Sequence, residues 1–120
     1  MSYEKGTKTS EDSRTETIHC PQYEDINGFG RLFGGRLMEW IDTAAGVCAI
    51  RHSGLVVTTA AVDHLEFKSG AYLGDIVVIV AKVVVVDVVN VIVVEMKADV
   101  VENLVAKKDV VLVKIIKYLY

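Results

Sequence analysis

The order of the predicted elements restricts the fold more than any other feature of this sequence. One strongly helical segment, from Gly34 or Gly35 to about residue 50, is followed by four runs rich in β-branched residues, near 55–67, 76–86, 91–101 and 110–118. Short polar steps separate the last three runs, at Asp87/Asn90, at Glu102 and Asn103, and at Lys107, Lys108 and Asp109. Parallel neighbours would need crossovers of about a dozen residues or more. The sequence therefore predicts an α+β fold in which one helix packs across an antiparallel sheet.

The helical segment carries one apolar stripe, which fixes the side that it buries. Its members recur at helical spacing: Leu37, Ile41, Ala44 and Cys48. Ahead of the helix, residues 13–20 alternate in hydropathy and stop at Pro21, the only proline, as a strand at a sheet edge does. Residues up to about 12 are polar and are predicted to form a flexible tail. One domain is therefore expected over 13–120.

The run at 55–67 is predicted to pair with a second copy of the chain. Strict alternation places Val57, Thr59, Ala61, Asp63, Leu65 and Phe67 on one face, and Thr58, Val62, His64 and Glu66 on the other. An unpaired edge on a strand with this continuous apolar face would invite aggregation, and dimerisation would cover it.

Composition excludes several classes of function. The net charge is −3 and no block of Lys and Arg occurs, which disfavours a nucleic-acid or anionic-membrane partner. The longest apolar stretch, 76–86, contains Lys82 and is well short of the ~20 residues of a membrane helix. No signal peptide is recognisable, and two cysteines are too few for a disulfide framework or a zinc site, so a cytoplasmic protein without a metal is expected.

The most informative motif is the stretch NGFGRLFGG at 27–35, which opens the helix with four glycines. It fits neither a dinucleotide-binding loop, since its spacing is off by one and no βαβ unit follows, nor a phosphate-binding P-loop, which needs Gly-Lys-Ser/Thr. A helix start exposes about four unpaired N–H groups, and Gly34 and Gly35 leave them unshielded. They can serve as an oxyanion hole. The alternative is that the glycines only permit a tight turn and close packing.

Two polar residues beside this motif are candidates for chemistry. Asp42 lies two turns into the helix, off the apolar stripe, and the small residues Ala45 and Gly46 at the next turn leave room for a ligand. Asn27 can orient a carbonyl group or a water. The alternatives are a solvated surface carboxylate and a turn residue.

The pattern N-x-x-G-x-x-F-G-G-x-L-M-x-x-x-D-x-x-A-G over 27–46 resembles the acyl-CoA thioesterases of the hot-dog fold. Further matching residues follow in the same order: Ala49, Arg51, His52, Val57, Thr59, Ala60, Val62, Asp63, Phe67, Gly74 and Asp75. The resemblance runs over about 13–80. At 89–91 the chain has Val-Asn-Val, where the family usually has a polar step similar to Thr-Ser-Met.

The resemblance implies a long central helix wrapped by a curved antiparallel sheet, in dimers that commonly assemble as a hexamer. It implies hydrolysis of fatty acyl-CoA to free acid and CoA, with Asn27 of one subunit and Asp42 of its neighbour in one site. Asp42 then activates water or attacks the thioester directly, Gly34 and Gly35 hold the oxyanion, and Thr59 supports by a hydrogen bond. No separate cofactor is needed, because CoA is part of the substrate.

The remaining candidates are cations that can contact CoA phosphates, and for each the alternative is an ordinary exposed charge: Arg51, His52, Lys68 and Lys82. Asp63 is expected to be structural, and Cys48 a core residue rather than a nucleophile.

Two alternatives to an acyl-CoA hydrolase remain open. The valine-rich region at 76–116 has no glycine at its turns, which is unusual for natural strands. The chain can therefore be a non-catalytic hot-dog module that binds acyl-CoA or a nucleotide, or an engineered variant that keeps the fold without the activity.

Overall fold

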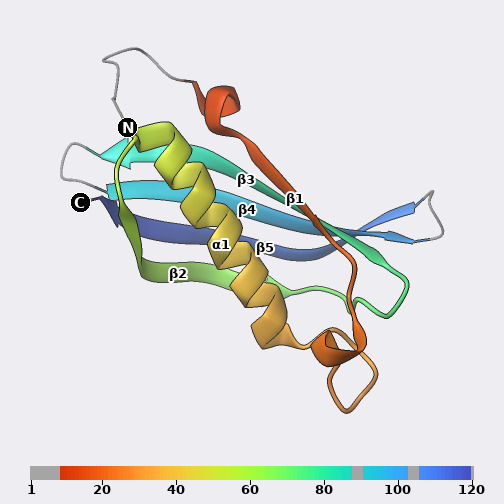
Figure 1. Ribbon diagram of the computed structural model, residues 1–120. Coiled ribbons are helices and arrows are strands. Elements are labelled where there is room, and N and C mark those ends of the chain that lie inside the picture. The colour runs from red at the N-terminus through yellow and green to blue at the C-terminus, as the bar shows by residue number, and fades with distance from the viewer. Residues whose placement is uncertain (1–8, 88–90, 103–105, 120) are drawn as a thin grey trace.

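The computed structural model describes residues 9–87, 91–102 and 106–119 (Figure 1). Its helical elements are two short 3-10 turns and one long helix: η1 (Ser10–Ser13), η2 (Tyr23–Asp25) and α1 (Gly34–Ser53). Its strands are β1 (Thr15–His19), β2 (Val57–Phe67), β3 (Ile76–Asp87), β4 (Val91–Glu102) and β5 (Ala106–Leu119). The predicted order of one helix followed by successive strands is confirmed.

The five strands form one open sheet in the order β1-β3-β4-β5-β2, and every pairing is antiparallel. Helix α1 lies across one face of this sheet, with β1 and β2 at its two edges (Figure 1). The predicted α+β fold is therefore confirmed, and the long β2 strand is an edge strand of the single chain.

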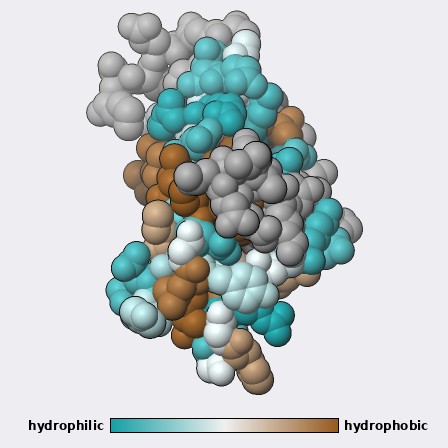
Figure 2. Space-filling model, turned by 90° about the vertical axis from the view of Figure 1, so that its right-hand side faces the viewer, coloured by the Kyte–Doolittle hydropathy of each residue, from teal (hydrophilic) through white to brown (hydrophobic). Residues whose placement is uncertain are grey.

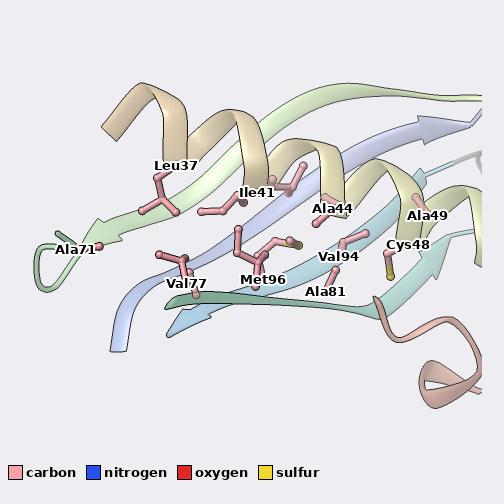
Figure 3. Close-up of a cluster of buried hydrophobic side chains, with 14 of the residues drawn as sticks. Leu37, Ile41, Ala44, Cys48, Ala49, Ala71, Val77, Ala81, Val94 and Met96 are labelled. Atoms are coloured by element: carbon pink, nitrogen blue, oxygen red, sulfur yellow. The ribbon is translucent and has the colours of Figure 1, made fainter. Parts of the chain in front are cut away.

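The core lies between α1 and the middle of the sheet. All four members of the predicted helical stripe are buried, and their side chains point toward β3 and β4 (Figure 3). On the sheet side they meet small and medium apolar residues: Val77, Ala81, Val94 and Met96. Close packing of alanines and valines lets the helix approach the sheet closely, which fixes where the first turns of α1 lie.

Truncation of Ile41, which is 0% exposed, is expected to destabilise the protein strongly. Ile41→Ala removes buried methyl groups and leaves a cavity, so the free energy of unfolding should fall by about 2–5 kcal/mol. Ile18→Ala is the matched control, because Ile18 on β1 is 62% exposed, and it should cost less than about 1 kcal/mol. Urea unfolding followed by the fluorescence of the single tryptophan, Trp40, measures both. Equal losses in the two variants would contradict this core.

The last strand is longer than its sequence indicates. The polar step at Lys107, Lys108 and Asp109 was predicted to separate strands, but β5 begins at Ala106 and pairs through this step with β4. That prediction is wrong because backbone pairing continues along the partner strand, whatever the polarity of side chains at the sheet end. The predicted polar steps at Asn90 and Asn103, like Val89, lie outside the described residues.

Strand β2 departs from strict alternation. Its pairing with β5 shifts between Thr59 and Ala61, where one extra residue forms a bulge. Thr59 pairs with Lys117 and Asp63 pairs with Lys114, three positions apart on β5. Paired residues share a face and odd separations change it, so Thr59 and Asp63 lie on opposite faces. The prediction that they share one face is therefore wrong.

The described part of the predicted N-terminal tail lies against β3. Ser10 Oγ donates a hydrogen bond to the Val83 carbonyl oxygen at 2.6 Å, and Lys82 Nζ lies 2.5 Å from Glu11 Oε1. On the side of the molecule shown in Figure 2, apolar patches alternate with polar ones. Among the described residues, no helix has the length and apolar character needed to cross a membrane.

Candidate functional site

The glycine-rich loop closes on itself before α1 begins. The Asn27 N–H donates to the Arg31 carbonyl oxygen at 2.7 Å, and the Gly30 N–H donates to the Asn27 carbonyl oxygen at 3.1 Å. Gly30 has φ = 82°, in the left-handed region, where an L side chain is strained. A glycine is therefore required at this point for the loop to turn.

The side chain of Asn27 is oriented by this loop. Its Oδ1 accepts hydrogen bonds from the N–H groups of Phe29 at 2.9 Å and Arg31 at 3.2 Å. Both backbone donors fix the amide with Nδ2 on the other side, as a donor. Among the described residues no acceptor contacts Nδ2, so Asn27 can donate to the oxygen of a ligand.

The first turn of α1 has free donors. Its N-cap residue, Phe33, makes no side-chain cap, and the first N–H that bonds back to the Phe33 carbonyl is that of Arg36, at 3.0 Å. Within the described part of the chain, the N–H groups of Gly34 and Gly35 have no backbone acceptor. A Cβ on Gly35 would lie 2.5 Å from Cε1 of the Phe33 ring, so this glycine also serves packing. The free donors permit the predicted oxyanion hole, which stays a prediction, and the close Phe33 ring shows that Gly35 also has a packing role.

These groups border a hollow of about 310 Å³. It is lined by the loop, the start of α1 and the segment after β2: Asn27, Arg31, Leu32, Gly34, Phe67, Lys68, Ser69 and Gly70. The Phe67 ring packs against the Cα side of Gly34. The hollow therefore combines amide donors with two cationic side chains, Arg31 and Lys68, which suits an anionic ligand.

A second cluster lies further along α1. Thr59 Oγ1 on β2 donates to Asp42 Oδ1 at 2.6 Å, and Lys117 Nζ on β5 lies 2.7 Å from the same oxygen and 2.5 Å from Thr59 Oγ1. The Asp42 side chain is 46% exposed, whereas the Lys117 side chain is only 4% exposed. Thr59, predicted to support the site by a hydrogen bond, thus makes one to Asp42, and Lys117 completes a triangle.

The charge state of Asp42 is set by this triangle. Partial burial raises the pKa of Asp42, but the hydrogen bonds from Lys117 and Thr59, together with the positive charge of Lys117, outweigh it. The net result is a pKa below the usual value of an aspartate. Asp42 is therefore ionised at neutral pH, as a base or a nucleophile must be.

Within one chain the two clusters are separate. Asp42 lies eight positions after Gly34, which corresponds to about 12 Å along the helix axis. It does not line the hollow that holds Asn27. The structure thus brings Asn27 together with Gly34 and brings Asp42 together with Thr59, but a single chain does not bring the two pairs together.

Two residues near these clusters were missed by sequence reasoning. Lys117 lies two positions after the apolar Ile115, so the two side chains point to the same face of the sheet. This is the one signal that could have placed Lys117 on the helix-facing side. Arg31 carries no comparable signal, because its place in the hollow depends on the loop conformation.

The predicted CoA-binding cations lie at opposite ends of the molecule. Lys68 lines the hollow. Arg51 donates to the Thr15 hydroxyl at 2.9 Å, His52 Nδ1 lies 2.8 Å from Ser13 Oγ, and Lys82 pairs with Glu11. Arg51 is about 25 Å along the helix axis from Gly34. One chain therefore does not gather these four side chains into one site.

Cys48 lies in the core, away from both clusters. Burial raises the pKa of the Cys48 thiol and the side chain is fully buried, which fits the predicted core role. Among the described residues, no group of three or more His, Cys, Asp or Glu side chains could hold a metal.

Comparison with known proteins shows what this chain is similar to. Residues 29–87 match the family described as the thioesterase superfamily. The sequence is also 43% identical over 54 residues to the acetyl-coenzyme A thioesterase of Rattus norvegicus, a match that covers 45% of this chain and 10% of the rat protein. The chain thus spans about a tenth of that thioesterase.

Solved structures agree over nearly the whole chain. A hexameric acyl-CoA thioesterase in its apo form superposes with a TM-score of 0.89 at 25% identity, covering 93% of this chain and 72% of that one. An acyl-CoA hydrolase from Staphylococcus aureus, in complex with butyryl coenzyme A, coenzyme A and coenzyme A disulfide, gives 0.88 at 25% identity, with 93% and 68% covered. The predicted hot-dog fold, and the resemblance to acyl-CoA thioesterases, are confirmed.

Proposed function

We propose that this protein hydrolyses acyl-CoA thioesters to a free acid and CoA, at sites that two subunits build together. The observation that carries the proposal is the hollow in which the Asn27 amide and the start of α1 offer free N–H donors beside Arg31 and Lys68. The acyl-CoA thioesterases with the same fold support it.

The chemistry needs two contributions from the protein, and the chain offers groups for both. The thioester oxygen accepts hydrogen bonds from Asn27 Nδ2 and from an N–H at Gly34 or Gly35, which stabilise the oxyanion that develops on attack. The ionised carboxylate of Asp42 takes a proton from the attacking water, or attacks the carbonyl carbon itself to form a mixed anhydride that water then hydrolyses to the free acid. CoA leaves as a thiolate, whose conjugate acid has a pKa near ~8.5, so no strong acid is required.

Two subunits are needed because the oxyanion donors and Asp42, directly or through one water, must act on the same carbonyl group, whereas Asp42 and Gly34 are about 12 Å apart along one helix. The exposed edge of β2, with Val62, Leu65 and Phe67 exposed, supports dimerisation through this strand. We further propose a trimer of such dimers, in line with the hexameric relative. In that assembly Arg51, His52 or Lys82 of one subunit can approach the CoA bound at another.

Release of free thiol from a panel of acyl-CoAs of increasing chain length tests the function. We expect turnover by the purified protein with at least one member of the panel, detected with a thiol reagent. Cys20 is exposed and would itself react, so Cys20→Ser is used to remove this background. Saturable CoA binding without thiol release from any substrate would instead support the non-catalytic hot-dog module.

A further inference from the structure

The contacts of Asp42 distinguish its two carboxylate oxygens. Oδ1 accepts hydrogen bonds from both Thr59 Oγ1 and Lys117 Nζ, at 2.6 and 2.7 Å. Among the described residues, Oδ2 has no partner, while the side chain as a whole is 46% exposed. One oxygen is therefore held by the protein, and the other has no hydrogen-bond partner among the described residues in a half-exposed side chain.

Lys117 is built into this contact rather than lying on the surface. Its side chain is 4% exposed, and its strand register sets it directly opposite Thr59. A Cβ placed on Gly46, one helical turn after Asp42, would lie 3.9 Å from Lys117 Nζ, so the ammonium group lies next to this turn of the helix. Helix, edge strand and neighbouring strand all contribute to hold one carboxylate oxygen.

We propose that Lys117 is a positioning residue for Asp42: with Thr59 it binds Oδ1 and so directs Oδ2 at the attacking water or the thioester carbon. This inference rests on the proposed function. The three hydrogen bonds are compatible with one another. Lys117 Nζ donates to Asp42 Oδ1 and to Thr59 Oγ1, and the Thr59 hydroxyl donates its own proton to Asp42 Oδ1. A carboxylate held by one oxygen keeps a fixed direction, which matters because small displacements of a reacting group lower rates steeply.

Lys117→Met tests the proposal, since it removes the donor and the charge but keeps an unbranched apolar chain. We expect kcat for acyl-CoA hydrolysis at pH 7 to fall on the order of 10-fold, with KM little changed. The sign of the pH effect follows from Asp42 being active when ionised. Loss of the cation that lowers its pKa must move the acid limb of the rate profile to higher pH. Lys117 and Thr59 are the charged and hydrogen-bonding groups that face Asp42 within the described residues.

Arg14→Met is the matched control, because it removes one positive charge from an exposed ion pair with Glu16 at the far edge of the sheet. It should leave both kcat and the acid limb unchanged. If Lys117→Met does not fold, Lys117→Gln replaces it in the same assay, since it keeps a hydrogen-bond donor without the charge. It should also move the acid limb of the rate profile to higher pH. An unaltered kcat and acid limb in the Lys117 variant, with active wild-type protein, would overturn the proposal, as would a gain in kcat.

A second readout separates this inference from the proposed function. The carboxyl carbon of Asp42, labelled with ¹³C and assigned by its loss in Asp42→Asn, is titrated by NMR in wild type and in the Lys117 variant. Its titration should move to higher pH without Lys117, whether or not any thioester is hydrolysed. Absence of thiol release by wild type would refute the proposed function alone. Identical titrations in the two proteins would refute the hold of Lys117 on Asp42.

Discussion

Replacing Asp42 with asparagine is expected to lower thioester hydrolysis on the order of 10²-fold or more and to destabilise the fold at the same time. The activity falls because an amide cannot accept a proton from water or form a bond to the acyl carbon as a carboxylate can. The stability falls because Lys117, 4% exposed, loses the negative charge that compensates its burial. Substrate affinity should change little, since the carboxylate acts mainly in the transition state.

The size of the stability loss follows from the exposure of the pair. Removing one partner of a fully buried ion pair costs about 3–5 kcal/mol, but Asp42 is half exposed and the asparagine oxygen still accepts a hydrogen bond. We therefore expect the free energy of unfolding to fall by about 1–3 kcal/mol, measured by urea denaturation at one fixed protomer concentration.

A double variant separates the two effects. Asp42→Asn combined with Lys117→Met removes both charges, so most of the lost stability should return while hydrolysis stays at the level of Asp42→Asn. Near-normal turnover of Asp42→Asn would remove Asp42 from the mechanism. If Asp42→Asn alone is as stable as wild type, the contact with Asp42 does not compensate the buried charge of Lys117.

Local patterns were enough to predict the helix and the free backbone donors at its start. The stripe from Leu37 to Cys48 depends only on helical spacing, and the free donors at Gly34 and Gly35 depend only on the absence of a capping side chain. Both are properties of a few consecutive residues. The sequence could therefore predict them without any knowledge of which strands are neighbours.

Features that depend on strand register could not be predicted. The bulge after Thr59 leaves no mark in the sequence, yet it moves Asp63 to the opposite face and sets Thr59 against Lys117. The contact between Lys117 and Asp42 joins residues 75 positions apart, through the pairing of the last strand with an edge strand. Such a contact follows from tertiary register, which the alternation of valines and isoleucines leaves unspecified.

Mixing two inactive variants is expected to restore activity if Asn27 and Asp42 of different subunits form one site. Asn27→Ala removes the amide donor and Asp42→Asn removes the carboxylate, so each should be nearly inactive alone. In a mixed dimer, one of the two sites combines the intact Asn27 of one chain with the intact Asp42 of the other. Random exchange at equal amounts should therefore give about a quarter of wild-type activity, measured as thiol release.

The matched control mixes wild type with a chain that carries both substitutions. Every site in such a mixed dimer lacks one of the two groups. Relative to pure wild type at the same total protein concentration, the activity should therefore fall from about a half before exchange to about a quarter after it. Two groups within one chain predict the opposite pair of results: no recovery in the first mixture and an unchanged half in the second, once subunit exchange is verified by mass. Because the separation of about 12 Å along α1 prevents one chain from placing both groups on the same carbon, we expect recovery in the first mixture and loss in the second.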